Sequence, residues 1–140
     1  MANAPKFANV KVGDSLPPLK LEPISRHQLA LYCGGSGDHN PIHVDIDFAK
    51  RFGMKDVFAH GMLSMAFLGR LVTGWVPQQN IKKLGTRFTS ITWIGDQITV
   101  TGKVLGKREE KGEKLVDLEV KCTNQSGQDT LQGNATVALS

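Results

Sequence analysis

The sequence predicts an α+β fold in which a curved antiparallel sheet wraps around one long buried helix. The segment 61–75 is apolar on nearly every side of a helix, with only Ser64, Arg70 and Thr73 as polar breaks, and a helix that is apolar all round must be buried. Segments rich in β-branched residues with local alternation follow it, which is typical of strands. These strands are expected at residues 81–93, 97–106, 114–124 and 130–139.

Length and composition predict a single domain over residues 1–140. The chain has 140 residues, of which 40% are hydrophobic and 21% charged, and a domain of this size buries enough surface to fold without disulfides or a structural metal. The longest apolar stretch, 61–76, contains Arg70 and is shorter than the roughly 20 residues of a transmembrane helix. Residues 1–11 lack the apolar run of a signal peptide, so we expect a cytoplasmic protein.

The charge and the cysteines exclude two further classes of protein. The net charge is +4, but the basic residues are dispersed and aromatic residues make up only 6%, unlike a nucleic-acid platform. This charge suits a small phosphate-bearing ligand or an acidic protein partner. Cys33 and Cys122 are too few and too far apart for a disulfide framework or a zinc ribbon, so we expect two buried thiols.

The elements before the central helix are short. Residues 19–21 are expected to form an edge strand, and Ser25 to cap a helix over 26–33 that ends at the glycine-rich residues 34–37. Pro41 favours irregular or extended backbone over 38–44. Asp47 is the expected cap of a short helix that runs to Phe52.

The turns after the central helix are predicted from glycine and polar residues. They are expected at Gly95-Asp96, at 107–112 and at 125–127.

Candidate chemistry is concentrated between Ser36 and His60. Asp38 and His43 are five residues apart across a loop that contains a proline, so no helical or strand periodicity fixes their relative position. If they converge, a carboxylate and an imidazole, which ordinarily titrate near about 3.9 and 6.5, could together hold and activate water. Gly61 begins the buried helix, where free amides and the helix dipole favour a developing oxyanion.

The run Ser36-Gly37-Asp38-His39-Asn40-Pro41-Ile42-His43, followed by Ala49, Gly53 and His60-Gly61-Met62, resembles the signature of the MaoC-like, (R)-specific enoyl-CoA hydratases. The resemblance covers about residues 32–75 and implies the hot-dog fold. It also implies that Asp38 and His43 are the catalytic pair that positions water, that Asn40 shapes the loop, and that the Gly61 amide polarises the thioester carbonyl.

This resemblance further implies reversible hydration of a trans-2-enoyl thioester, carried on CoA or acyl-carrier protein, to the (R)-3-hydroxyacyl thioester. No metal and no redox cofactor would be required. Dimers whose sheets join edge to edge are expected, and larger or mixed assemblies are an alternative. Ser64 and Tyr32 would line the acyl pocket or pack in the core.

Other interpretations of the same residues remain open. His39, His43, Asp45, Asp47 and His60 offer metal-ligand types, but their spacing matches no helical zinc motif. His39 is expected at the surface or the pocket mouth, and His60 to order the turn into the helix.

Two other functions share this fold. One is a catalytically silent subunit that binds acyl thioesters, and the other is a hot-dog thioesterase. The central helix lacks the carboxylate that such thioesterases carry, and Cys33 is a poor nucleophile because no activating partner is evident.

Overall fold

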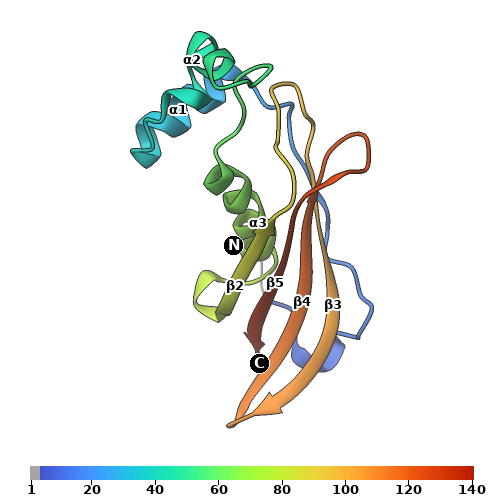
Figure 1. Cartoon of the computed structure of the whole chain (residues 1–140). Coiled ribbons are helices and arrows are strands. Elements are labelled where there is room, and N and C mark those ends of the chain that lie inside the picture. The colour runs from blue at the N-terminus through green and yellow to red at the C-terminus, as the bar shows by residue number, and fades with distance from the viewer. Residues whose placement is uncertain (1–3) are drawn as a thin grey trace.

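The structure, a computed structural model that describes residues 4–140, confirms the α+β prediction and the curved sheet of the hot-dog expectation (Figure 1). Residues 1–3, part of the predicted domain 1–140 and of the N-terminal stretch 1–11, lie outside the described residues. The sheet has five antiparallel strands in the order β1-β3-β4-β5-β2. Their bounds are Leu19–Lys20 (β1), Ile81–Phe88 (β2), Thr99–Glu110 (β3), Glu113–Thr123 (β4) and Asp129–Leu139 (β5).

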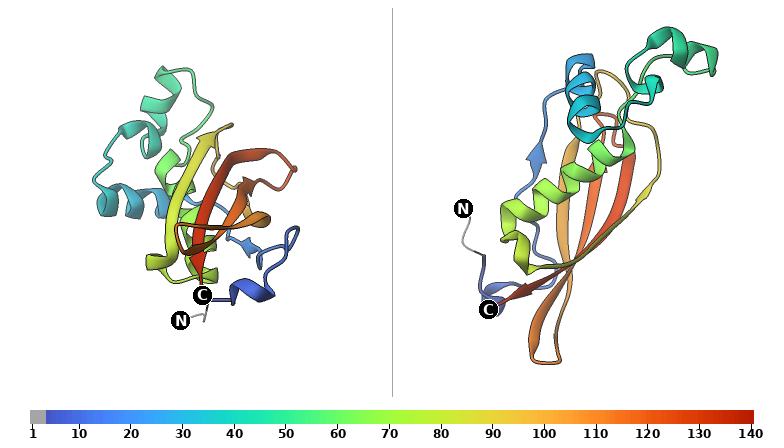
Figure 2. Two further views of the ribbon diagram at one scale, coloured as in Figure 1. Left: turned by 90° about the horizontal axis from the view of Figure 1, so that it is seen from below. Right: turned by 90° about the vertical axis from the view of Figure 1, so that its left-hand side faces the viewer.

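The central helix α3 spans Gly61–Trp75, as predicted, and lies against the inner face of the curved sheet (Figure 2). Leu68 and Val72 are fully buried in one core with Val100 and Val120 of the sheet. The expectation of burial on every side was wrong, because Met62 is 56% exposed. The sheet covers one side of α3, and part of the opposite side remains open.

Helix α1 spans Arg26–Ser36, three residues beyond the predicted end. Ser25 caps it as expected, accepting a hydrogen bond from the Gln28 amide at 3.0 Å. The helix continues through the first glycines and ends at Gly37, whose φ of +76° is the left-handed conformation that stops a helix.

Helix α2, Ile46–Arg51, is capped by Asp45 and not by Asp47. Asp45 Oδ1 accepts hydrogen bonds from the Asp47 and Phe48 amides, each at 3.0 Å. Asp47 lies in the first turn, so the cap had been placed two residues too late. Residues 41–43 are also more regular than predicted, because Pro41–His43 forms a 3-10 turn, η2.

The largest differences between predicted and observed strand ends lie at two places, and the other ends agree within two residues. β3 and β4 stay paired as far as Glu110 and Glu113, so their turn comprises only Lys111 and Gly112 instead of 107–112. β2 ends at Phe88, five residues before the predicted end. β2 pairs with β5 along one side only, and its other side is an edge of the sheet.

The two thiols and the chain ends complete the description. Cys33 and Cys122 are buried and free, as predicted. The Phe7 amide donates a 2.9 Å hydrogen bond to the Ser140 carbonyl, at the end of the molecule opposite α1 and α2 (Figures 1 and 2). Two further 3-10 turns, Phe7–Asn9 (η1) and Gln78–Asn80 (η3), lie outside the helices described above. Within residues 4–140, no helix combines the length and apolarity needed to cross a bilayer.

Candidate active site

The segment from α1 to α2 lies beyond the N-terminus of α3, so the loop 38–43 meets the start of the central helix (Figure 2). One ligand-type atom from each of Asp38, His43 and His60 lies within 4.8 Å of the others. Asp38 and His43, whose relative position the sequence left open, therefore converge. This cluster lies where the helix dipole of α3 favours negative charge.

His43 is held in one orientation by the backbone. Its Nδ1 lies 2.7 Å from the Phe58 carbonyl oxygen, and because a carbonyl only accepts, Nδ1 carries the donated hydrogen. The neutral ring then has its free lone pair on Nε2. His43 is 8% exposed, so this nearly buried imidazole has its orientation fixed by the backbone.

The loop that carries Asp38 is stabilised by its own side chains. The Asp38 amide donates to Ser36 Oγ at 3.1 Å, and Asp38 Oδ1 accepts from the Asn40 amide at 3.2 Å. Asn40 Oδ1 in turn accepts from the Ile42 amide at 3.1 Å and caps η2. Asn40 therefore shapes the turn that presents His43, whereas the Asp38 side chain is exposed.

Gly61 supplies a free amide beside an apolar cavity. The Leu63 and Ser64 amides donate to the His60 carbonyl, whereas the Gly61 amide precedes the first intrahelical bonds. Gly61 and Ser64 line a cavity of about 360 Å³, and Ser64 is 2% exposed. The other lining residues are Phe58, Ala59, Phe88, Thr89, Ser90, Ile91, Thr92 and Leu131.

Tyr32 and His60 are not among the residues that line this cavity. The Tyr32 ring packs edge to face on the His60 ring, with centroids 4.8 Å apart. His60 is fully buried and stacks on His43, with ring centroids 4.0 Å apart. Burial, and secondarily His43, lower the pKa of His60 below its usual 6.5.

Sequence reasoning missed two of these contacts. His60 was expected only to order the turn, yet it touches the candidate pair directly. The position of His60, immediately before a buried helix and beside Gly61, was the sequence feature that could have indicated a place in the site. His39 is exposed, as expected, but its Nδ1 lies 3.3 Å from Cys33 Sγ, so the thiol has an imidazole neighbour that spacing did not reveal.

The alternative metal site fits poorly. Asp45 is occupied as a helix cap, and His39 contacts Cys33. The remaining cluster includes two imidazoles whose planes differ by only 26° in a stack. Since the lone pairs lie in the ring planes, they do not point to one nearby centre, as tetrahedral zinc requires.

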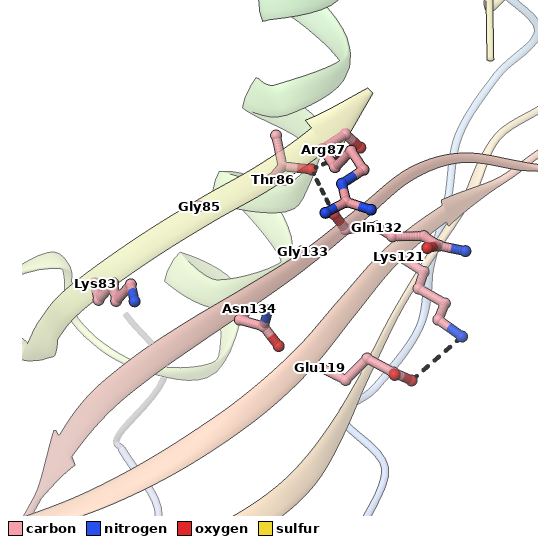
Figure 3. A pocket seen from close by; sticks show the side chains of 9 residues that line it. All are labelled: Lys83, Gly85, Thr86, Arg87, Glu119, Lys121, Gln132, Gly133 and Asn134. Atoms are coloured by element: carbon pink, nitrogen blue, oxygen red, sulfur yellow. Dashed lines mark hydrogen bonds and ion pairs between the residues drawn. The ribbon is translucent and has the colours of Figure 1, made fainter. Parts of the chain in front are cut away.

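A larger hollow of about 510 Å³ lies on the face of the sheet that points away from α3 (Figure 3). Its only carboxylate, Glu119, lies 3.4 Å from the Lys121 ammonium. Asp38, His43 and Gly61 all lie outside the lining of this hollow. Figure 3 shows Lys83 and Arg87 of β2, Gln132 and Asn134 of β5, and Glu119 and Lys121 of β4 around it.

The fold and the site together define a hot-dog domain with a carboxylate and imidazole pair above the amide end of its central helix. Residues 8–126 match the MaoC-like domain family, and the chain belongs to that family.

Three comparisons illustrate the relationship. The (R)-specific enoyl-CoA hydratase of Rhodospirillum rubrum is 34% identical over 95% of this chain and 90% of its own. The mitochondrial 3-hydroxyacyl-[acyl-carrier-protein] dehydratase of Arabidopsis thaliana is 29% identical over 93% of this chain and 78% of its own. The unliganded R-hydratase PhaJ1 of Pseudomonas aeruginosa superimposes with a TM-score of 0.83 at 28% identity, covering 96% of this chain and 86% of that one.

Proposed function

We propose that this protein is a hydro-lyase that reversibly hydrates a trans-2-enoyl thioester to the (R)-3-hydroxyacyl thioester. The observation that carries the proposal is the convergence of Asp38 and His43 beside the amide end of α3. The family relationship gives the reaction class, and the relatives' names include both a CoA and an acyl-carrier-protein thioester.

His43 Nε2 is the proposed base and Asp38 the second group that orients water. Nε2 takes a proton from water as its oxygen bonds to the β-carbon, and the π electrons move toward the thioester oxygen. The pair then returns a proton to the α-carbon, so that one water is added in balance. In reverse, the same groups eliminate water from the 3-hydroxyacyl thioester.

The Gly61 amide is the proposed donor to the thioester oxygen. Charge develops there in the enolate-like transition state, and the loss of one such donor typically costs about 2.7–4 kcal/mol. The cavity that Gly61 shares with Ser64 is lined in part by Phe58, Phe88 and Ile91, which suits an acyl chain. Asn40, which caps η2, would affect substrate binding indirectly, by shaping the loop. Tyr32 would do so by packing against His60.

A thioesterase is less well supported, because helix α3 contains no carboxylate over Gly61–Trp75. A silent acyl-binding subunit is also less well supported. A protein that only binds would not need an oriented imidazole with a free Nε2 next to Asp38.

The proposed assembly is at least a homodimer. β2 is an edge strand of eight residues, and such edges are usually paired or protected. Exposed apolar side chains lie near its Phe88 end, where Phe88 is 52% and Met62 56% exposed. Light scattering should give twice the 15.2 kDa chain mass or more, and a monomer at assay concentration contradicts this assembly.

We place the protein in the cytoplasm, and the two free thiols support a reducing compartment.

The decisive experiment for the activity is the loss of enoyl absorbance with crotonyl-CoA and with longer enoyl-CoA and enoyl-acyl-carrier-protein substrates. Hydration of at least one chain length, with the (R) product shown by chiral analysis, supports the proposal. Wild-type protein that is inactive on the whole series overturns it.

A further inference from the structure

His60 is the one histidine with no exposed surface, although it lies within a site that must exchange water and protons. It directly precedes α3 and serves as its N-cap residue. Three residues of the site surround its ring. His43 stacks on it at 4.0 Å, Tyr32 packs edge to face at 4.8 Å, and the Asp38 carbonyl oxygen lies 3.3 Å from Nε2.

The contact with Asp38 identifies the tautomer of His60. A backbone carbonyl can only accept a hydrogen bond, so Nε2 carries the hydrogen. Nδ1 is then unprotonated in the neutral ring, and it is buried with no hydrogen-bond partner among residues 4–140. Protonation of Nδ1 would create a buried N–H without an acceptor, which is costly.

Burial and the charge of His43 both disfavour the protonated form of His60, and Asp38 opposes them. Tyr32 on α1 and His43 on η2 pack against its ring, and a carboxylate oxygen of Asp38, in the loop between them, lies within 4.8 Å of one of its ring nitrogens. Burial is the main cause of its lowered pKa and the neighbouring His43 the second, and these outweigh the opposing effect of Asp38. Protonation of His60 is therefore disfavoured, both by its buried position and by the missing acceptor at Nδ1.

We propose that His60 is the positioning residue of this site: it fixes the Asp38 backbone and the His43 ring together while remaining neutral through the reaction cycle. One imidazole can then carry the mobile proton, and the other acts as a rigid donor and stacking surface. This role rests on the proposed hydration activity, and it adds a second histidine that does not itself touch the substrate.

Two variants of His60 distinguish the effect of its hydrogen-bond donor from the effect of its ring. In His60→Gln the side-chain amide nitrogen can occupy nearly the place of Nε2 and donate to the Asp38 carbonyl. In His60→Leu both the donor and the aromatic stack are lost. We expect His60→Leu to lower kcat about 100-fold, as displacement of a reacting group by about 1 Å can do, and to leave KM within about twofold of the wild-type value. The kcat of His60→Gln should be at least about tenfold higher than that of His60→Leu.

The matched control is His27→Gln, which changes an exposed histidine of α1 outside the site and should leave kcat unchanged. Equal kcat for His60→Leu and the wild type overturns the positioning role while leaving the hydratase proposal intact. A wild-type protein inactive on every thioester overturns the hydratase proposal instead.

A measurement on the wild-type protein covers the case in which His60→Leu fails to fold. Imidazole ¹⁵N NMR should show His60 as the Nε2–H tautomer, with a titration midpoint below the usual 6.5 of histidine. A proton on His60 Nδ1, or titration of His60 at its usual pKa, refutes the proposal without any variant.

Discussion

Gly61 faces the ring of Phe88 so closely that a β-carbon at position 61 would lie 3.0 Å from Phe88 Cε1. The contact joins the first residue of α3 to the last residue of β2. Both residues line the cavity of about 360 Å³. A side chain at position 61 therefore has to displace the ring, enter the cavity, or both.

Substitution of Gly61 should weaken catalysis in proportion to the size of the new side chain. Gly61→Ala should be mildly impaired, because Phe88 is 52% exposed and its ring can swing away. Gly61→Val should lose at least about tenfold in kcat/KM, since the acyl thioester is displaced from the amide. Phe88→Leu added to Gly61→Ala should restore part of the loss, and steady-state kinetics with no such recovery would show that the steric contact is not the cause.

The proposed catalytic roles of Asp38 and His43 can be tested without disturbing the loop. Asp38→Asn keeps the side-chain oxygen that can accept from the Asn40 amide, and His43→Asn keeps a donor toward the Phe58 carbonyl while removing Nε2. Each should lower kcat by roughly 10²- to 10⁴-fold, the usual contribution of acid and base groups. Thermal melting should stay close to wild type for Asp38→Asn, because this side chain is exposed. Turnover that survives both changes rules out their roles.

The cap of α2 offers a charge-matched comparison. Asp45→Ala removes the acceptor of two amide hydrogen bonds and should lower the free energy of unfolding by about 1 kcal/mol. Asp47→Ala removes the same charge from the first turn and should cost only roughly 0.3–0.5 kcal/mol. Urea unfolding of the two proteins provides the measurement, and equal losses would mean that charge, not capping, stabilises the helix.

The burial of His60 predicts how stability responds to pH. Its pKa is below 6.5 in the folded state, so as pH falls below about 6.5 the unfolded chain binds a proton that the folded protein does not. The His60 contribution is complete above that pH and declines below it. Asp117 and Asp129, whose pKa values are lowered from 3.8 mainly by hydrogen bonds from Arg108 and Gln132, lose their contributions only at more acid pH.

Urea unfolding at about pH 7.5 and pH 5 should therefore show a lower free energy of unfolding at pH 5. His60→Gln should reduce the difference between the two pH values, because its side chain does not titrate. A His60→Gln protein with the full wild-type difference would assign the pH dependence to other groups.

The central helix was predictable to the residue, and its neighbours were not. An apolar run that begins at Gly61 and is followed by Pro77 has few alternatives. For α2, by contrast, Asp45 and Asp47 are both good caps. Which of the two residues caps α2 depends on where η2 places the chain that follows it, and this position is set by the three-dimensional structure.

The convergence of Asp38 and His43 could not be derived from their spacing. It depends on Gly37 ending α1 in a left-handed conformation and on Asn40 capping η2. The stack of His60 on His43 is less predictable still, because it joins residues 17 positions apart across α2 and the chain that follows it. Before the structure, only the family resemblance paired Asp38 with His43.

The hydrogen bond between the Phe7 amide and the Ser140 carbonyl places both ends of the described chain together, at the opposite end of the domain from the loop 38–43. Helix α3, 15 residues or about 22 Å long, extends from the site toward that end. A tag, a surface tether or a second domain attached there would not crowd the loop 38–43. This arrangement also suits the domain for circular permutation, because a short linker could join the ends far from the loop 38–43.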